Sequence, residues 1–141
     1  MVLFITVKLP QFNAFFISTE TTFLARALPK ISSLISVKVG QHLKLINIEE
    51  IECFYSENKG TYLYTSEGRN YLLDTTLELL EQELEPQTFF RISRKYFVNI
   101  NAIKDMVSYT NSRLQIKLNT YNEDEVIVAR ERVKDFKEWL E

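Results

Sequence analysis

Apolar and polar residues alternate along much of the chain after residue 33, and this alternation predicts β-strands. Residues 42–48 (HLKLINI) and 113–118 (RLQIKL) alternate with a period of two, which is typical of strands that bury one face. The expected strands are residues 34–39, 42–48, 51–55, 61–65, 69–73, 102–109, 113–118 and 126–128, with turns at residues 40–41, 56–60, 67–68, 110–112 and 121–125. The pattern therefore predicts a mainly β chain.

Two segments carry a helical pattern instead. Residues 74–85 place leucines at helical spacing, with Thr75 and Glu78 fitting a capping box at the start and Pro86 after the end. Residues 130–140 place Val133, Phe136 and a leucine on one face. We therefore expect one internal helix and one C-terminal helix beside the strands.

The first thirty residues contain apolar runs without recognisable chemistry. A weak boundary follows them, where Pro29-Lys30 precedes two serines. We expect residues 1–30 to form an N-terminal segment of unknown role and residues 31–141 to form one domain. Lys8 and Pro10 interrupt the apolar runs, which are too short to span a bilayer. A soluble, cytoplasmic protein without a membrane partner is expected.

The residue types needed for catalysis are scarce. The chain has one histidine, His42, and one cysteine, Cys53, and it lacks the glycine-rich motifs that cradle phosphates. The single histidine therefore argues against a paired-histidine metal site and gives little support to a catalytic Ser-His or Cys-His pair. We expect His42 to lie on the surface of a strand and Cys53 to be a small buried hydrophobe. No enzymatic activity, metal or cofactor is expected.

One segment stands apart by its charge. Residues 91–104 contain no Asp or Glu but include Arg91, Arg94, Lys95 and Lys104, in a chain whose net charge is −2. Apolar residues are interleaved with these cations, so the segment can be anchored while its cations face outward, as a phosphate- or base-contacting surface requires. Composition alone leaves open an ordinary solvated rim on a core strand.

Four pieces of sequence together resemble the LytTR DNA-binding domain of bacterial transcriptional regulators. The pieces are the strand and aromatic run at residues 48–55, the helix at 72–84, the stretch FRISRKYFVN at 90–99, and Val128-Ala129-Arg130. They follow one another in the order that the family has. The resemblance extends from about Val37 to the C-terminus.

The resemblance implies an elongated, mainly β fold of small antiparallel sheets that contacts double-stranded DNA through loops. Arg suits guanine edges, Asn and Thr suit base edges, and Lys suits phosphate. The residues expected to meet DNA are Asn58, Lys59, Gly60, Thr61, Ser93, Arg94, Lys95, Arg130 and Arg132. Arg91 and Asn99 also match the family but are expected to tie loops to the backbone. The implied target is a direct-repeat site occupied by a dimer.

The chain departs from the family at three positions. Ser93 stands where the family often has His, Lys95 where it often has Ser, and Ala129 where Ser is usual. These changes affect the expected base specificity and leave the expected fold unchanged. Members that are response regulators of two-component systems often carry an N-terminal receiver domain. Residues 1–30 lack its acidic cluster, so a receiver domain or regulatory partner would lie outside this chain, and phosphorylation control is not predicted.

A second hypothesis stays open. The apolar N-terminal segment and the slightly acidic balance would also suit a protein-interaction module whose residues 1–30 dock a partner.

Overall fold

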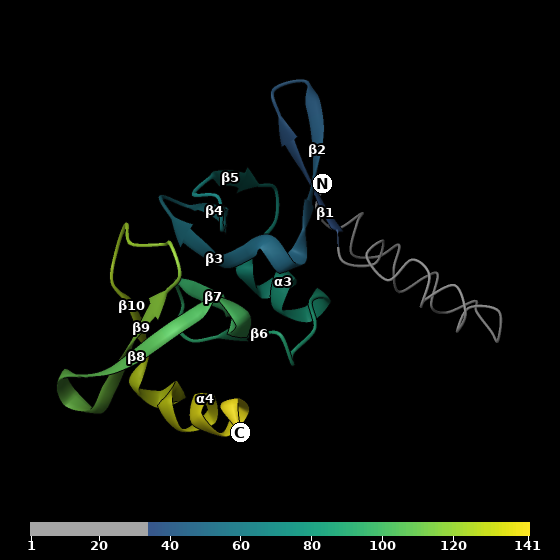
Figure 1. Cartoon of the computed structure of the whole chain (residues 1–141). Coiled ribbons are helices and arrows are strands. Elements are labelled where there is room, and N and C mark those ends of the chain that lie inside the picture. The colour runs from purple at the N-terminus through teal and green to yellow at the C-terminus, as the bar shows by residue number, and fades with distance from the viewer. Residues whose placement is uncertain (1–33) are drawn as a thin grey trace, which may run out of the picture.

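The computed structural model describes residues 34–141 (Figure 1). The strands are β1 (Leu34–Val39), β2 (His42–Asn47), β3 (Ile51–Glu57), β4 (Gly60–Thr65), β5 (Asn70–Leu73), β6 (Phe89–Arg91), β7 (Tyr96–Asn99), β8 (Ile103–Tyr109), β9 (Arg113–Leu118) and β10 (Val126–Val128). The α-helices are α3 (Leu77–Glu83) and α4 (Val133–Leu140), and single 3-10 turns are η2 (Ile48–Glu50), η3 (Ile100–Ala102), η4 (Thr110–Ser112) and η5 (Arg130–Arg132).

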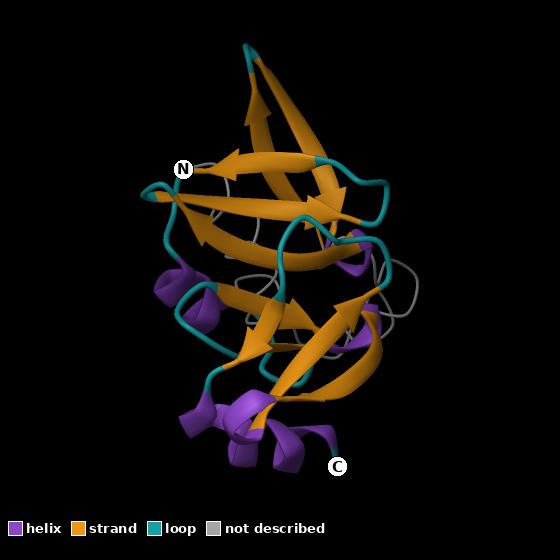
Figure 2. Cartoon of the chain, turned by 90° about the vertical axis from the view of Figure 1, so that its left-hand side faces the viewer, coloured by secondary structure: helices purple, strands orange, loops and turns teal. Residues whose placement is uncertain are grey.

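The strands form three small antiparallel sheets. β1 pairs with β2, the five-stranded sheet has the order β5-β4-β3-β7-β6, and the three-stranded sheet has the order β10-β9-β8. The sheets follow one another along the length of the molecule, with the β1–β2 hairpin at one end and α4 at the other (Figure 2). The expectation of an elongated, mainly β fold with one internal and one C-terminal helix is confirmed.

The five-stranded sheet separates two hydrophobic clusters, because alternate residues of a strand point to opposite faces. On β3, Phe54 belongs to one cluster, whereas Cys53 and Tyr55 belong to the other. The first cluster packs β1, β2 and α3 against the sheet, and the second packs the three-stranded sheet and α4. Cys53 is fully buried, as expected, and burial raises the pKa of its thiol.

The internal helix is shorter than predicted, and its predicted capping box is wrong. The N-cap is Thr76 in place of Thr75, and its Oγ1 accepts a hydrogen bond from the Leu79 amide at 3.2 Å. The helix ends at Glu83, and the C-cap residue Leu84 already has an extended backbone before the chain reaches Pro86. Two adjacent threonines offer the same cap chemistry, so the sequence pattern alone did not distinguish them.

The C-terminal helix also starts later than predicted. Residues 130–132 form the 3-10 turn η5, and α4 begins at Val133. Ala129 occupies the cap position of η5 and makes no side-chain capping bond. A helix end without a side-chain capping acceptor often satisfies its backbone groups with the more tightly wound 3-10 turn.

A buried carboxylate joins the five-stranded sheet to the loop that follows β9. Glu52 on β3 is 2% exposed. It accepts hydrogen bonds from the Thr120 amide at 3.0 Å, the Thr120 hydroxyl at 2.6 Å and the Tyr121 amide at 3.0 Å. The position of residues 120–121 is therefore fixed by β3.

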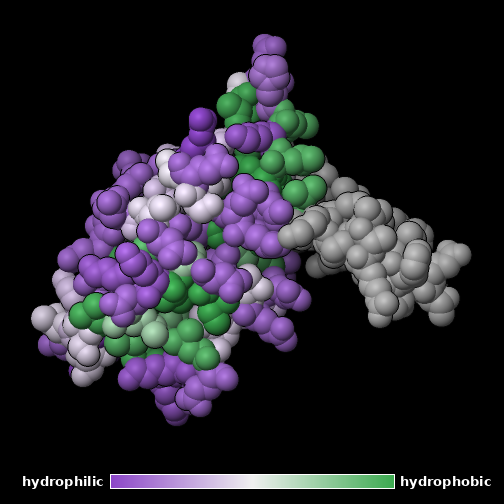
Figure 3. All heavy atoms as spheres, viewed as in Figure 1, coloured by the Kyte–Doolittle hydropathy of each residue, from purple (hydrophilic) through white to green (hydrophobic). Residues whose placement is uncertain are grey.

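The β1–β2 hairpin projects from the body and carries apolar side chains on its surface (Figure 3). Leu43 is 67% exposed and Leu45 is 60% exposed, whereas Ile35 and Val37 on β1 are fully buried. His42 lies on the surface at the start of β2, as expected. Within residues 34–141, no helix is both long enough and apolar enough to cross a membrane.

Candidate nucleic-acid interface

The loop between β6 and β7 lies at the centre of the candidate interface. It consists of residues 92–95, and its backbone is bonded to two other segments. The Ser56 amide donates to the Lys95 carbonyl at 2.9 Å, and the Ala129 amide donates to the Ile92 carbonyl at 2.8 Å. The structure therefore brings together the three segments that the sequence predicted to meet DNA.

The first of these segments is the tight turn between β3 and β4. Glu57 pairs with Gly60, so the turn has two central residues, Asn58 and Lys59, whose φ angles are +49° and +66°. Two positive φ angles are what a type I′ hairpin turn requires, and Asn accepts them readily. A Cβ on Gly60 would lie 3.1 Å from Leu72 Cδ1, so this position favours glycine. The turn presents Lys59 to solvent.

Arg91 holds the β6–β7 loop from behind. Its side chain is 7% exposed, Nε donates to the Ser93 carbonyl and Nη2 donates to the Arg94 carbonyl, both at 2.8 Å. The guanidinium also pairs with Glu78 at 3.2 Å and Glu81 at 3.4 Å on α3. This geometry confirms the expected structural role of Arg91.

Two further polar side chains fix the same region. The Asn99 amide nitrogen donates to the Ile51 carbonyl at 2.8 Å, and its oxygen accepts from the Asn101 amide at 2.9 Å. The Ser93 hydroxyl accepts from the amides of Lys95 and Tyr96 at 3.2 and 3.1 Å. Ser93 thus acts on the loop conformation through its side chain, and Asn99 ties β7 to β3, as expected.

Of the residues expected to meet DNA, Asn58, Lys59, Arg94 and Arg130 are exposed. Within the described part of the chain, their side chains make no hydrogen bond or ion pair, which leaves them available to a ligand. Other expected contact residues are buried or already bonded within the chain. Thr61 is 7% exposed, and Arg132 Nη1 donates to the Arg91 carbonyl at 2.9 Å. Lys95 pairs with Asp124 at 2.5 Å.

No sequence pattern marks Asp124 as a functional residue. It lies 29 positions after Lys95, within residues 121–125, which were predicted only as a polar turn. An ion pair between two loops that are distant in sequence leaves no periodic pattern, so a single sequence offers no signal for it. Among residues 34–141, no cluster of three or more His, Cys, Asp or Glu is placed to hold a metal ion.

A cluster of tyrosines supports the interface from the second hydrophobic cluster. The Tyr96 and Tyr121 hydroxyls are 3.1 Å apart, and the ring of Tyr55 stacks on that of Tyr62 with centroids 5.3 Å apart. Burial raises the pKa of Tyr96 to about 12 and also raises the pKa values of Tyr55 and Tyr121. The hydroxyls of these three tyrosines therefore stay protonated throughout the neutral range.

Stability should fall in alkaline solution because of this cluster. An unfolded tyrosine ionises near pH 10, whereas folded Tyr96 keeps its proton to about 12. The stabilisation from neutral Tyr96 is present below about pH 10 and is lost as the pH rises from there towards the folded pKa. Urea unfolding at several pH values measures this loss, and Tyr96→Phe should make the dependence shallower. Equal pH dependence in the two proteins would contradict the assignment to Tyr96.

The sequence pattern of the LytTr DNA-binding domain family matches residues 41–141. The chain belongs to this family. A solved LytTr DNA-binding domain from Bacillus cereus superimposes with a TM-score of 0.69, covering 77% of this chain and 96% of that domain at 21% sequence identity. That likeness shows that the two chains share the LytTr fold.

Two longer relatives are also similar to this LytTr chain. The transcriptional regulatory protein YpdB of Escherichia coli is 25% identical over 122 residues, which are 86% of this chain and 49% of YpdB. YpdB of Shigella flexneri is 29% identical over 91 residues, 63% of this chain and 36% of that protein. The matched region thus spans less than half the length of these relatives.

Proposed function

We propose that this chain is a sequence-specific DNA-binding transcriptional regulator that contacts successive major grooves through its loops, on direct-repeat sites occupied by two copies. The observation that carries the proposal is the backbone joining of three loops around residues 92–95. A rigid set of loops holds cations in fixed positions, and fixed positions are needed to read base edges. Membership of the LytTr DNA-binding domain family supports the same conclusion.

The proposal gives the exposed residues distinct roles. Arg94 and Arg130 are proposed to read guanine, because a guanidinium can fork onto O6 and N7. Asn58 is proposed to read a base edge, and Lys59 and Lys95 are proposed to contact phosphates. Gly60 and Thr61 shape the β3–β4 turn, Ser93 holds its own loop, and Arg132 supports the backbone of β6.

Local charge, not net charge, would supply the electrostatic attraction. The chain carries −2 overall, but the acidic helix α3 directs Glu78 and Glu81 to Arg91 behind the β6–β7 loop. The exposed cations Lys59, Arg94 and Arg130 lie on the three joined segments. We therefore expect few phosphate contacts and a modest dependence of affinity on salt.

Arg94→Ala and Lys59→Ala should affect DNA binding in different ways. Loss of a bidentate guanine contact should cost about 1–3 kcal/mol on the selected site and relax the preference at one base pair. Loss of a phosphate contact should weaken binding to all duplexes alike and reduce the salt slope by about 1. The measurement is fluorescence anisotropy on a duplex selected from a random pool at about 0.15 M salt.

Arg69→Ala is the matched control. Arg69 is exposed and lies in the turn between β4 and β5, at the opposite end of β4 from Lys59. It should bind DNA as the parent does. If Arg94→Ala and Lys59→Ala also bind like the parent, then the proposed loop contacts are wrong.

The alternative hypothesis, an interaction module whose residues 1–30 dock a partner, concerns residues outside those that the structure describes. The selection experiment separates the two hypotheses. Enrichment of a motif as two direct repeats supports the regulator, whereas a folded protein that enriches no sequence would favour the interaction module.

A further inference from the structure

The ammonium of Lys95 is held by a carboxylate of its own chain. Lys95 Nζ lies 2.5 Å from Asp124 Oδ2, and it also lies 5.4 Å from the centre of the Tyr96 ring. The other carboxylate oxygen, Oδ1, accepts a hydrogen bond from the Glu125 amide at 2.8 Å. Lys95 is thus the one cation of the β6–β7 loop whose partner is a surface carboxylate.

Both members of this pair are accessible to a ligand. The side chains of Lys95 and Asp124 are 36% and 53% exposed. The hydrogen bond between them raises the pKa of Lys95 and lowers the pKa of Asp124, so both are charged at neutral pH. An exposed pair of this kind is weak, because water screens the attraction and two side chains lose freedom. A phosphate can therefore compete with the carboxylate for the ammonium.

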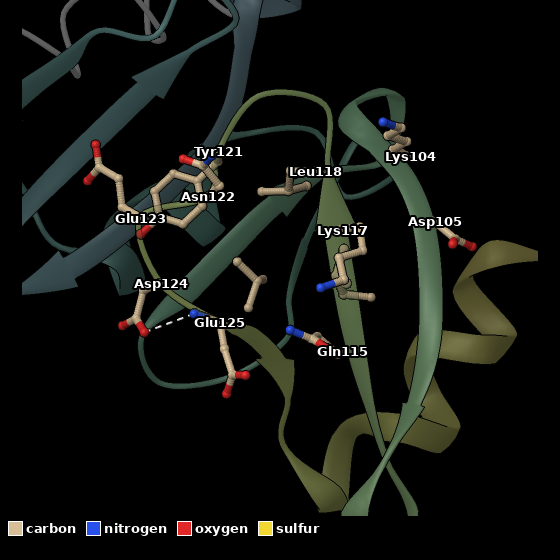
Figure 4. A pocket seen from close by; sticks show the side chains of 12 residues that line it. Lys104, Asp105, Gln115, Lys117, Leu118, Tyr121, Asn122, Glu123, Asp124 and Glu125 are labelled. Atoms are coloured by element: carbon tan, nitrogen blue, oxygen red, sulfur yellow. Dashed lines mark hydrogen bonds between the residues drawn. The ribbon is translucent and has the colours of Figure 1, made fainter.

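The loop that carries Asp124 is held by side-chain hydrogen bonds of Glu52, Glu123 and Glu125, and a hollow lies beside it. Glu52 holds residues 120–121, and β10 begins at Val126. The loop borders a hollow of about 690 Å³ beside β8 and β9 (Figure 4). Lys104 and Lys117 also line this hollow. The middle of the loop has space beside it, and other cations lie around the same hollow to offset the charge of a carboxylate that leaves Lys95.

We propose that Asp124 competes with DNA phosphate for Lys95 and thereby determines how strongly the domain discriminates its site from other DNA. A carboxylate and a phosphate ester are both anions that accept hydrogen bonds from an ammonium, so Asp124 occupies the place of a backbone phosphate in the free protein. Nonspecific binding, which depends mainly on phosphate contacts, is weakened by the competition. At a correctly docked site, the base contacts hold a phosphate next to Lys95. The contact between Lys95 and that phosphate then forms in spite of Asp124. This inference rests on the proposed function.

The test compares two substitutions that each remove one negative charge from the same loop. Asp124→Asn keeps an oxygen that can accept from the Glu125 amide, but it no longer pairs with Lys95. Glu125→Gln is the control, because Glu125 accepts from the Tyr109 hydroxyl at 3.0 Å and does not contact Lys95. Asp124→Asn should bind a short duplex of unrelated sequence about two- to five-fold more tightly than Glu125→Gln does, the range expected for an exposed ion pair. Affinity for the selected site should rise less.

A double variant separates competition from a general change of charge. In the background Lys95→Gln, Asp124→Asn should give no gain over Glu125→Gln, because the ammonium is absent. Thermal unfolding of each variant verifies that the domain is folded.

The proposal is overturned if Asp124→Asn and Glu125→Gln bind the unrelated duplex equally, or if the gain persists without Lys95. A different result would identify a failure of the proposed function: if the folded parent binds neither the unrelated duplex nor any selected one, the proposed function is wrong and this inference falls with it.

Discussion

Glu52→Ala is expected to lower the free energy of unfolding by about 3–5 kcal/mol. The Glu52 carboxylate accepts from two backbone amides and one hydroxyl, all from Thr120 and Tyr121. Removing it leaves these donors without a partner in a region where Tyr121 is 5% exposed. A buried donor without a partner costs about 1–3 kcal/mol. The substitution also frees the loop that carries Asp124 from β3.

Urea unfolding measures this loss, and two further variants show its cause. Glu52→Gln keeps one acceptor oxygen and should lose roughly half as much stability. Glu50→Ala, at an exposed position in η2, is the control and should change stability by less than about 0.5 kcal/mol. A loss below about 1 kcal/mol for Glu52→Ala would mean that water replaces the carboxylate at low cost.

Arg91→Met is expected to reduce both stability and DNA binding, although Arg91 itself is buried. The substitution leaves the carbonyls of Ser93 and Arg94 without their donors, which should cost about 2–4 kcal/mol in total. The ion pairs to Glu78 and Glu81 add little, because those carboxylates are 70% and 43% exposed. DNA binding should weaken because the loop that presents Arg94 is no longer held.

Arg91→Lys and Glu78→Gln complete this experiment. Lysine keeps the charge but cannot donate to two carbonyls and two carboxylates in the planar geometry of a guanidinium. Arg91→Lys should therefore lose nearly as much stability and DNA affinity as Arg91→Met. Glu78→Gln should stay within about 0.5 kcal/mol of the parent. If Arg91→Lys retained parental stability and DNA affinity, charge alone would explain the role of Arg91.

The strands with a regular period of two were predictable from the sequence. The stretches HLKLINI and RLQIKL became β2 and β9 because one face of each strand meets apolar neighbours. Residues 91–104 were recognised by their charge, but the conformation of the segment around the β6–β7 loop was not predicted. Residues 89–99 form two short strands and a loop, and strands of three and four residues are too short to show a period.

The candidate site was predictable only in part. The segment 91–95 contains Arg91, Arg94 and Lys95 within five positions, and nothing in their order shows which is buried, which is exposed and which is paired. In the structure Arg91 is buried, Arg94 is exposed and Lys95 is paired with Asp124. These differences arise from α3 and from residues 121–125, which reach the segment only through the fold. Tertiary contacts, not local pattern, decided the role of each cation.

The first strand, β1, lies outside the region that the family pattern matches. The match to the family begins at residue 41, yet Ile35 and Val37 on β1 are fully buried in the first hydrophobic cluster. A fragment cut at the start of the match would expose the apolar residues of β2 and β5 that β1 packs beside. The family pattern therefore starts after a strand that contributes to the core, and fragments of this chain made for DNA-binding work should begin before Leu34.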